Sequence, residues 1–423
     1  MHISLPYGRS SIAGEVPDSV AVEFANPREW LEKQSERELV IAAISHPSGG
    51  RRLRELASGV RSAVIVTCDK TRGVPSQITI PFILQELNST GLHSEHVRLL
   101  VATGLHKGET ETDVRERIGS ELHDMEVSVH DSDEHDQLNF LGNLSSGTPL
   151  YLNRAVVEAD LVIIESTVEP HFFAGFTGGS KVILPGAAGS ETIIHNHSWR
   201  NIDDSRSRYG VACNPIRRDS NEALSFLKKT FSLDLVLGSD KGIVFASSGN
   251  PIHSFNKVAS EVSAHSEMKI ISQPNLVITT NGGFPLDRNV YQCVKGISVP
   301  EDVLSQDSRI VMVGECIDGT AHGEFRSLLC NGTPDEVYSK LERSDAPVRD
   351  QWQVQVLCRI LRRNPVWFVT RSELQTDIES MHMHYASTIE EALNSAQLTT
   401  GERVLVVPQG PPQSYTEHKF SAL

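Results

Sequence analysis

Short runs rich in Val, Ile and Leu alternate along the chain with longer stretches whose apolar residues recur at helical spacing. This alternation is typical of a mostly parallel sheet with helices on both faces. In the first part of the chain the pattern predicts strands at 63–67, 97–102, 161–164 and 233–237, and helices at 77–87, 109–118 and 220–230. We therefore expect an α/β domain there.

A second set of elements begins near residue 274. Its predicted strands are 276–280, 309–313 and 366–369, and its predicted helices are 334–341, 351–362 and 389–396. The fold class is thus α/β, with two α/β domains of mostly parallel sheet. We place the boundary near residue 270 and expect the last strand, 403–407, to return to the first domain. The expected domains are residues 1–270 plus 402–423, and residues 271–401.

Polar loops follow three of the predicted strands. Asp69 and Arg72 come after the first strand, His106 comes after the second, and an Asn-Gly-Gly turn at 281–283 follows the strand at 276–280. In open α/β sheets, ligands bind outside the carboxyl ends of the strands. The three loops therefore predict one shared active-site cleft between the two domains.

Most of the candidate chemistry lies in one segment, residues 169–197. It contains a histidine after a proline, a glycine-rich turn, a lysine after that turn and a His-x-His pair: His171, Gly178, Gly179, Lys181, His195 and His197. Glycines let the backbone approach a ligand closely, and imidazoles ligate metals or transfer protons near neutral pH. The lysine suits a phosphate contact or, with a lowered pKa, a nucleophile.

The glycine-rich turn is not a phosphate-binding P-loop. That motif needs a glycine directly before the lysine and Ser or Thr directly after it, whereas Ser180 and Val182 flank Lys181 here. A Walker-type nucleotide hydrolase is therefore excluded. The following residues, 190–199, are predicted to be helical with Ser190 as the N-cap, which would hold His197 on a rigid element.

With these loops and this segment, the chain resembles the lactate racemase family that uses the nickel-pincer nucleotide. The resemblance covers nearly the whole chain in residue types and spacings, and it also suggests that the last strand crosses back to the first domain. It departs at two positions, with Gly73 in place of an expected proline and Lys107 in place of an expected arginine. Neither is a catalytic position.

The resemblance implies a role for each candidate residue. His106 and His171 would be the two catalytic bases, and Lys181 would form the covalent thioamide link to the cofactor while His197 supplies the protein ligand to nickel. His195 is interpreted as structural. Further cofactor contacts would come from Asp69, Gly178 and Gly179, and substrate contacts from Arg72, Tyr291, Gln292 and Lys295.

The activity implied is a racemase or epimerase, an isomerase that inverts C2 of a 2-hydroxy acid by reversible hydride transfer to the cofactor. The cofactor is the pyridinium-3-thioamide-5-thiocarboxylic acid mononucleotide carrying nickel, and its biosynthetic enzymes would be needed for loading. Lactate, malate, a sugar acid and an aromatic hydroxy acid all remain candidate substrates. Arg72 would hold the carboxylate through a planar, two-pronged hydrogen bond, and Lys295 would add a point charge.

Two other functions remain open. One is a zinc-dependent hydrolase that uses His171, His195 and His197, although the chain has no H-E-x-x-H motif and no carboxylate at ligand spacing. The other is a non-catalytic homologue that carries the cofactor. Metal content and the absorbance of a bound pyridinium-nickel chromophore would separate the first of these from the racemase.

Composition restricts the partners. The net charge of −15 argues against a nucleic-acid or anionic-membrane partner, because binding to phosphates needs a basic face. Six scattered cysteines without C-x-x-C spacing indicate neither a disulfide framework nor a zinc ribbon, which fits a reducing cytoplasm. We expect no targeting or membrane-spanning segment.

Overall fold

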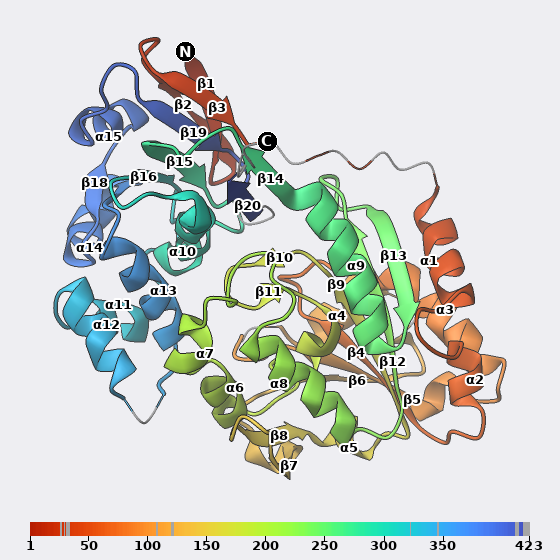
Figure 1. Cartoon of the computed structure of the whole chain (residues 1–423). Coiled ribbons are helices and arrows are strands. Elements are labelled where there is room, and N and C mark those ends of the chain that lie inside the picture. The colour runs from red at the N-terminus through yellow and green to blue at the C-terminus, as the bar shows by residue number, and fades with distance from the viewer. Residues whose placement is uncertain are drawn as a thin grey trace, which may run out of the picture.

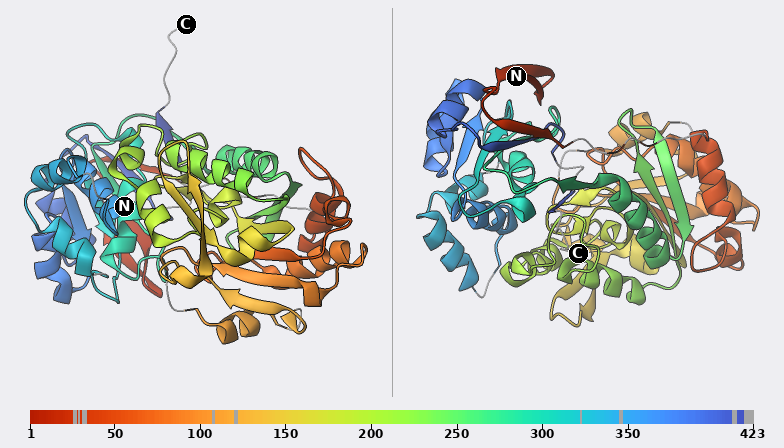
Figure 2. Two further views of the ribbon diagram at one scale, coloured as in Figure 1. Left: turned by 90° about the horizontal axis from the view of Figure 1, so that it is seen from below. Right: turned by 45° about the horizontal axis from the view of Figure 1, so that its top comes forward.

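The computed structural model describes residues 1–25, 28, 30, 34–106, 109–119, 122–321, 323–344, 347–410 and 414–417. These residues form two α/β units that lie side by side, each built on a six-stranded sheet (Figure 1 and Figure 2). Parallel pairing predominates in both sheets, which confirms the predicted fold class.

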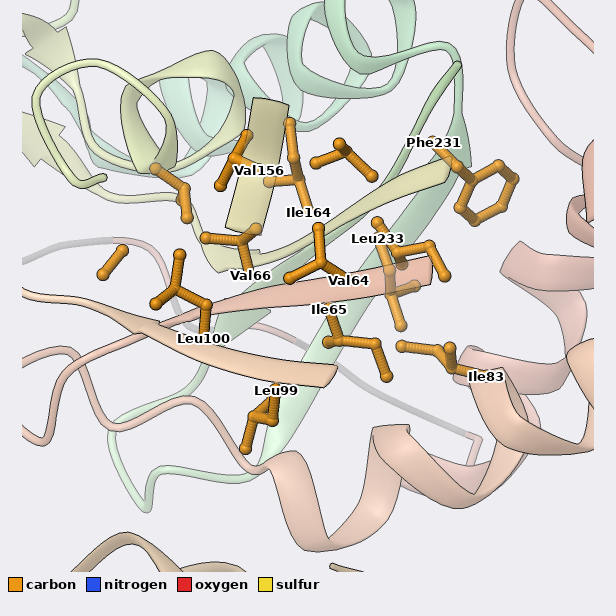
Figure 3. Packing of buried hydrophobic residues seen from close by; sticks show 14 of the residues in the cluster. Val64, Ile65, Val66, Ile83, Leu99, Leu100, Val156, Ile164, Phe231 and Leu233 are labelled. Carbon is orange, nitrogen blue, oxygen red and sulfur yellow. The ribbon is translucent and has the colours of Figure 1, made fainter. Parts of the chain in front are cut away.

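The first sheet forms the core of the first unit. Its strands in spatial order are β13 (Ile243–Gly249), β12 (Thr230–Leu237), β9 (Leu161–Thr167), β4 (Ala63–Cys68), β5 (Val97–Ala102) and β6 (Glu126–Val129). Among these strands β13 is antiparallel to β12, and the other neighbours are parallel. In Figure 3, Val64 and Val66 face the same side as Val156, whereas Ile65 points to the opposite side with Ile83. The sheet is therefore apolar on both faces, as a covered parallel sheet requires.

Helices and short hairpins surround this sheet. They are α1 (Glu36–Ser45), α2 (Leu53–Ala57), α3 (Ser76–Asn88), α4 (Glu111–Ile118), α5 (Arg154–Glu158), α6 (Ser190–Asn196), α7 (Trp199–Asp203), α8 (Pro215–Ala223), α9 (Pro251–Ser266), β7 (Leu138–Asn143), β8 (Pro149–Asn153), β10 (Pro170–His171) and β11 (Gly175–Phe176). The predicted helix 220–230 is wrong. The helix α8 begins earlier, where the Asn214 side chain accepts the Arg217 N–H at 2.9 Å, and it ends at Ala223 before the chain extends into β12.

The second sheet is parallel throughout. Its spatial order is β18 (His384–Ala386), β17 (Val366–Val369), β16 (Arg309–Val313), β15 (Leu276–Thr280), β19 (Arg403–Val407) and β3 (Ala21–Phe24). The helices of this unit are α10 (Val290–Ser298), α11 (Gly323–Leu329), α12 (Pro334–Glu342), α13 (Gln351–Leu361), α14 (Gln375–Ser380) and α15 (Ile389–Ser395). The strands β15, β16 and β17 match their predicted bounds to the residue.

The strand β19 lies in the second sheet, and not in the first as the sequence predicted. It is hydrogen-bonded to β15 on one side and to β3 on the other. Burial explains the difference, because residues 404–407 are enclosed on both faces and complete the core of this sheet. The hairpin of β1 (His2–Tyr7) and β2 (Ser10–Glu15) packs on the same core, so the red and dark-blue parts of the chain lie together (Figure 1).

Side chains of α13 tie the two units together. Arg359 is 7% exposed and pairs with Glu301, and its Nη1 donates to the carbonyl oxygen of Ile202 at 3.2 Å. Gln355 Nε2 donates to the carbonyl oxygen of Trp199 at 3.0 Å. These hydrogen bonds therefore attach α7, the helix that follows α6, to the second unit.

Three remaining findings bear on the sequence predictions. Gly73 has a φ of +61°, which proline cannot adopt, so the backbone here differs from one built with the expected proline. Lys107 lies outside the described residues. No helix in the described part of the chain is long and apolar enough to cross a membrane.

Candidate active site

The loop after β4 carries a tightly held carboxylate. Asp69 is 5% exposed, and its Oδ2 lies 2.8 Å from His106 Nδ1 while its Oδ1 accepts the Thr71 N–H at 2.9 Å. Burial alone would raise the pKa of Asp69, but the hydrogen bonds from His106 and Thr71 outweigh it and, with nearby cations, lower the pKa to about 2. An ionised Asp69 makes Nδ1 of His106 the donor and leaves its Nε2 as a base.

Arg72 follows in the same loop. Its Nη1 donates to Glu169 Oε1 at 3.0 Å, and its backbone carbonyl accepts the Thr167 hydroxyl at 3.3 Å. The Glu169 side chain is half exposed, so this ion pair is weak in water and open to exchange with another carboxylate. The guanidinium thus stands where an anionic ligand can replace Glu169.

The backbone conformation of the glycine-rich turn requires glycine at two positions. Gly178 and Gly179 have φ values of +70° and +58°, and a Cβ on Gly178 would lie 2.7 Å from the carbonyl oxygen of Thr167. No side chain fits there. The turn leads directly into a short 3-10 helix, Gly179–Val182, which presents Lys181.

A buried arginine from α8 holds this turn in place, and sequence reasoning missed it. Arg217 is 2% exposed and donates to the carbonyl oxygens of Gly178, at 2.7 Å, and Phe176, while its guanidinium stacks 4.0 Å from the Phe255 ring centroid. Burial lowers the pKa of Arg217 to about 9. In the sequence, Arg217 could have been noticed only as a charged residue on the face of a short helix whose other residues are buried.

Lys181 lies among cations. Its Nζ is 3.4 Å from His171 Nε2 and 5.9 Å from the ring centroid of Phe173, and no carboxylate of the described residues pairs with it. Burial, and then the charges of Arg72 and other nearby cations, lower the pKa of Lys181 well below its ordinary value. This shift favours the neutral amine, the form that a nucleophile needs.

The hydrogen bonds of His171 agree with a neutral lysine. Its Nδ1 accepts the Ala174 N–H at 3.3 Å, so the proton of the neutral ring is on Nε2 and points at the Lys181 amine. Burial, and then the charge of Lys181 and of other cations, lower the pKa of His171 well below its usual range. His171 is thus a neutral hydrogen-bond donor at its Nε2.

His197 ends α6 as its C-cap, and Gly189, not the predicted Ser190, is the N-cap. The His197 ring is buried, edge-on to Phe173 and Trp352 at centroid distances of 4.9 and 5.1 Å. Burial first, and then the charge of Lys181, lower its pKa to about 3. Its Nδ1 contacts Asn196 Oδ1 at 3.0 Å, and no described residue hydrogen-bonds to its Nε2. A neutral imidazole with a free Nε2 is a suitable metal ligand.

His195 is directed elsewhere. Its Nδ1 bonds to the carbonyl oxygen of Glu191 one turn back on α6 at 2.9 Å. Within the described residues, no three His, Cys, Asp or Glu side chains converge in a way that could hold a metal ion. The structure therefore does not assemble His171, His195 and His197 into the zinc site of the hydrolase alternative.

The second unit contributes α10. Lys295 Nζ donates to Gln292 Oε1 at 2.7 Å, and Tyr291 donates its hydroxyl to Asp350 Oδ1 at 3.1 Å. Burial, and then the charge of Arg72, lower the pKa of Lys295 to about 8. Arg72 also acts on Lys181, so cations of both units lie within electrostatic reach of one another.

Known proteins match the chain over nearly its full length. The model of the lactate racemase N-terminal domain matches residues 7–210, and the model of the lactate racemase C-terminal domain matches residues 270–411. The chain is 36% identical over 418 residues to the lactate racemase of Thermoanaerobacterium thermosaccharolyticum, covering 97% of this chain and 98% of that protein. It is 33% identical over 421 residues to the lactate racemase of Lactiplantibacillus plantarum, covering 96% and 98%.

Solved structures agree. The lactate racemase apoprotein from Thermoanaerobacterium thermosaccharolyticum superposes with a TM-score of 0.91 at 36% identity, covering 99% of this chain and all of that one. A Thermotoga maritima protein gives a TM-score of 0.67 at 16% identity, over 92% of this chain and all of that one, which shows a shared fold alone.

The neutral state of Lys181 can be measured directly in the protein without cofactor. Limited acylation with a small amine-reactive reagent, followed by peptide mass spectrometry, gives the labelling rate of each lysine against pH. Lys181 should reach its half-maximal rate well below pH 10.5, because burial and neighbouring cations disfavour the ammonium form. The Lys295→Met variant removes one of those cations and should move the midpoint upward. A midpoint for Lys181 near 10.5 would contradict the electrostatics described here.

Proposed function

The chain belongs to the lactate racemase family of isomerases, and we propose that it inverts C2 of a 2-hydroxy acid, lactate or a related acid, with a covalently bound nickel-pincer nucleotide. One observation carries the proposal. Three features lie within electrostatic reach of one another: the Lys181 amine with its lowered pKa, the His197 Nε2 to which no described residue hydrogen-bonds, and cations of both units. Covalent attachment, metal ligation and carboxylate binding need these three features together.

The residues present fit this cofactor. Lys181 offers an uncharged amine without a carboxylate partner in the described chain, and His197 offers one nitrogen donor, which suits nickel(II) that already has soft sulfur ligands. Gly178 and Gly179 pack against Thr167 and Phe255, so the turn that presents Lys181 can form only with glycine at both positions. When bound, the cofactor would supply a hydride acceptor, so that the C2 hydrogen could leave without forming a carbanion.

The substrate carboxylate would be bound from both units. Arg72 presents a planar fork that now contacts the half-exposed Glu169, and an incoming carboxylate would exchange with that side chain. Lys295, held by Gln292 at 2.7 Å, adds a second cation from α10. Two cations on opposite walls fix which way the C2 atom faces.

The two histidines have complementary proton states. His106 donates from Nδ1 to Asp69, so its Nε2 can take the hydroxyl proton. His171 accepts at Nδ1 from Ala174, so the neutral ring holds its single proton on Nε2. His171 would have to gain a second proton before it could return one, because a neutral imidazole that lost its proton would become an anion. A neutral base and a protonated partner around one hydroxyl carbon would suit inversion in either direction, because their roles exchange with the substrate enantiomer.

The attachment can be tested by mass. Protein coexpressed with the enzymes of cofactor synthesis should show a covalent adduct after denaturation, and Lys181→Ala should remove it because we assign the linking amine to Lys181. His197→Ala should keep the adduct and lose nickel, measured by elemental analysis. Lys295→Ala, which removes another lysine of the cleft, should keep both. A wild-type protein without an adduct would refute the cofactor assignment.

Steady-state kinetics separate the catalytic bases from the anion-binding site. His106→Ala and His171→Ala should each lower kcat by about 10²- to 10⁴-fold, because each removes a proton-transfer group. Arg72→Ala should also raise KM, because it removes a carboxylate contact. His195→Ala serves as the matched control and should leave both constants near the wild-type values. Near-normal turnover of both histidine variants in both directions would overturn the assignment of the two catalytic bases.

Isotope retention tests the reaction itself. Substrate carrying deuterium at C2 should keep its label through many turnovers in ordinary water, because hydride transfer keeps the hydrogen within the closed site. Unlabelled substrate in heavy water should gain almost no deuterium at C2, as measured by NMR of the recovered acid. Exchange with solvent at the rate of racemisation would instead show that C2 loses a proton.

A further inference from the structure

The side chain of Asn196 lies between His197 and a buried carboxylate. Asn196 Oδ1 is 3.0 Å from His197 Nδ1, and Asn196 Nδ2 is 3.1 Å from Asp219 Oδ2. Asn196 ends α6, and Asp219 lies on α8. Asn196 and Asp219 are fully buried and His197 is 5% exposed, so water does not compete for these bonds.

Two acceptors fix which way the Asn196 amide points. Its Nδ2 contacts the carboxylate of Asp219 and, at 3.4 Å, the backbone carbonyl oxygen of Ile216, and a carbonyl oxygen can only accept. Asp219 is itself held by the hydroxyls of Ser146 and Thr148, at 2.9 and 3.2 Å. The amide oxygen of Asn196 must therefore face His197.

An amide oxygen can only accept a hydrogen bond, so the ring proton of His197 is on Nδ1. The Nε2 atom then carries a lone pair. Phe173 and Trp352, packed edge-on against the ring, limit its rotation about the bond to the backbone. Tautomer and orientation are thus set by the protein before any ligand arrives.

We propose that Asn196, oriented by Asp219, is a positioning residue that fixes the His197 tautomer and presents Nε2 to the metal of the cofactor. This inference rests on the proposed function for the identity of the metal, but its structural part concerns the protein alone. Partners of this kind beside a ligating histidine tune metal affinity, because they hold the ring and raise its basicity.

The tautomer can be read in the protein without cofactor. Long-range ¹H–¹⁵N NMR spectra of protein labelled at histidine nitrogens distinguish the two neutral tautomers, and the His197→Gln spectrum identifies the signals of His197. Wild type should show His197 protonated on Nδ1, and Asn196→Ala should lower the ratio of that tautomer to the other about tenfold, because one buried hydrogen bond is lost.

Two further variants show whether the effect is specific. Asp219→Asn keeps an acceptor for the Asn196 amide and should retain the wild-type tautomer. Asn201→Ala is the matched control, because Asn201 is a buried asparagine whose amide donates to the Asn196 backbone carbonyl at 2.9 Å without contacting the His197 ring. It should leave the tautomer unchanged. A wild-type His197 protonated on Nε2, or an unchanged ratio in Asn196→Ala, would overturn the proposal. The wild-type spectrum decides alone if Asn196→Ala does not fold.

Nickel retention then connects the tautomer to the cofactor. In protein loaded by coexpression, Asn196→Ala should weaken nickel binding roughly 10- to 100-fold, measured by competition with a chelator, while the covalent adduct on Lys181 keeps its mass. Unchanged nickel binding in a variant with an altered tautomer would overturn the role proposed for Asn196. Loaded wild type without nickel would instead refute the proposed function, because the tautomer result stands independently of it.

Discussion

The candidate site depends on a lysine amine whose charged form is disfavoured. A partly buried lysine normally pairs with a carboxylate, but the Lys181 amine has cations and the imidazole of His171 near it. Two effects disfavour the ammonium form of Lys181: partial removal from water, and repulsion by the neighbouring positive charges. The positive φ of the glycine turn and the hydrogen bond from the buried Arg217 hold the backbone that carries this amine.

Much of the fold followed from the sequence, because buried parallel strands are continuous apolar runs. The bounds of β15, β16, β17 and β19 were predicted to the residue, and the α/β class was correct, whereas the short strand β18 was not predicted. The failures have physical reasons. The helix expected at 220–230 crossed the point where apolar residues change from helical to extended spacing, which short windows do not resolve. The sequence pattern of β19 fits either of the two apolar sheets. Its place depends on which strands it pairs with, here β15 and β3, and local sequence does not determine that pairing.

The sequence identified the side chains of the candidate site that can bind a ligand or transfer a proton. The structure showed how these side chains lie relative to one another. Arg72, Lys181 and Lys295 could be singled out by type and position. The effect of these cations on one another's pKa could not be predicted from the sequence, because it depends on the distances between segments of different units. The supporting residues Arg217, Asn196 and Asp219 escaped notice for another reason. Each is a polar residue on a short helix, a pattern that solvent exposure explains equally well until the partners are seen.

The arrangement of the second sheet has a consequence for biogenesis. Strand β3 is synthesised early, yet its hydrogen-bonding neighbour β19 comes 382 residues later, counted from Ala21 to its partner Arg403. Residues 21–24 therefore emerge from the ribosome long before their place in a sheet exists. The first unit can form its own core during that interval, but the second sheet cannot be completed before β19 is synthesised. Until then the edge of β15 that β19 covers stays open, so residues 403–407 set when the second sheet can close.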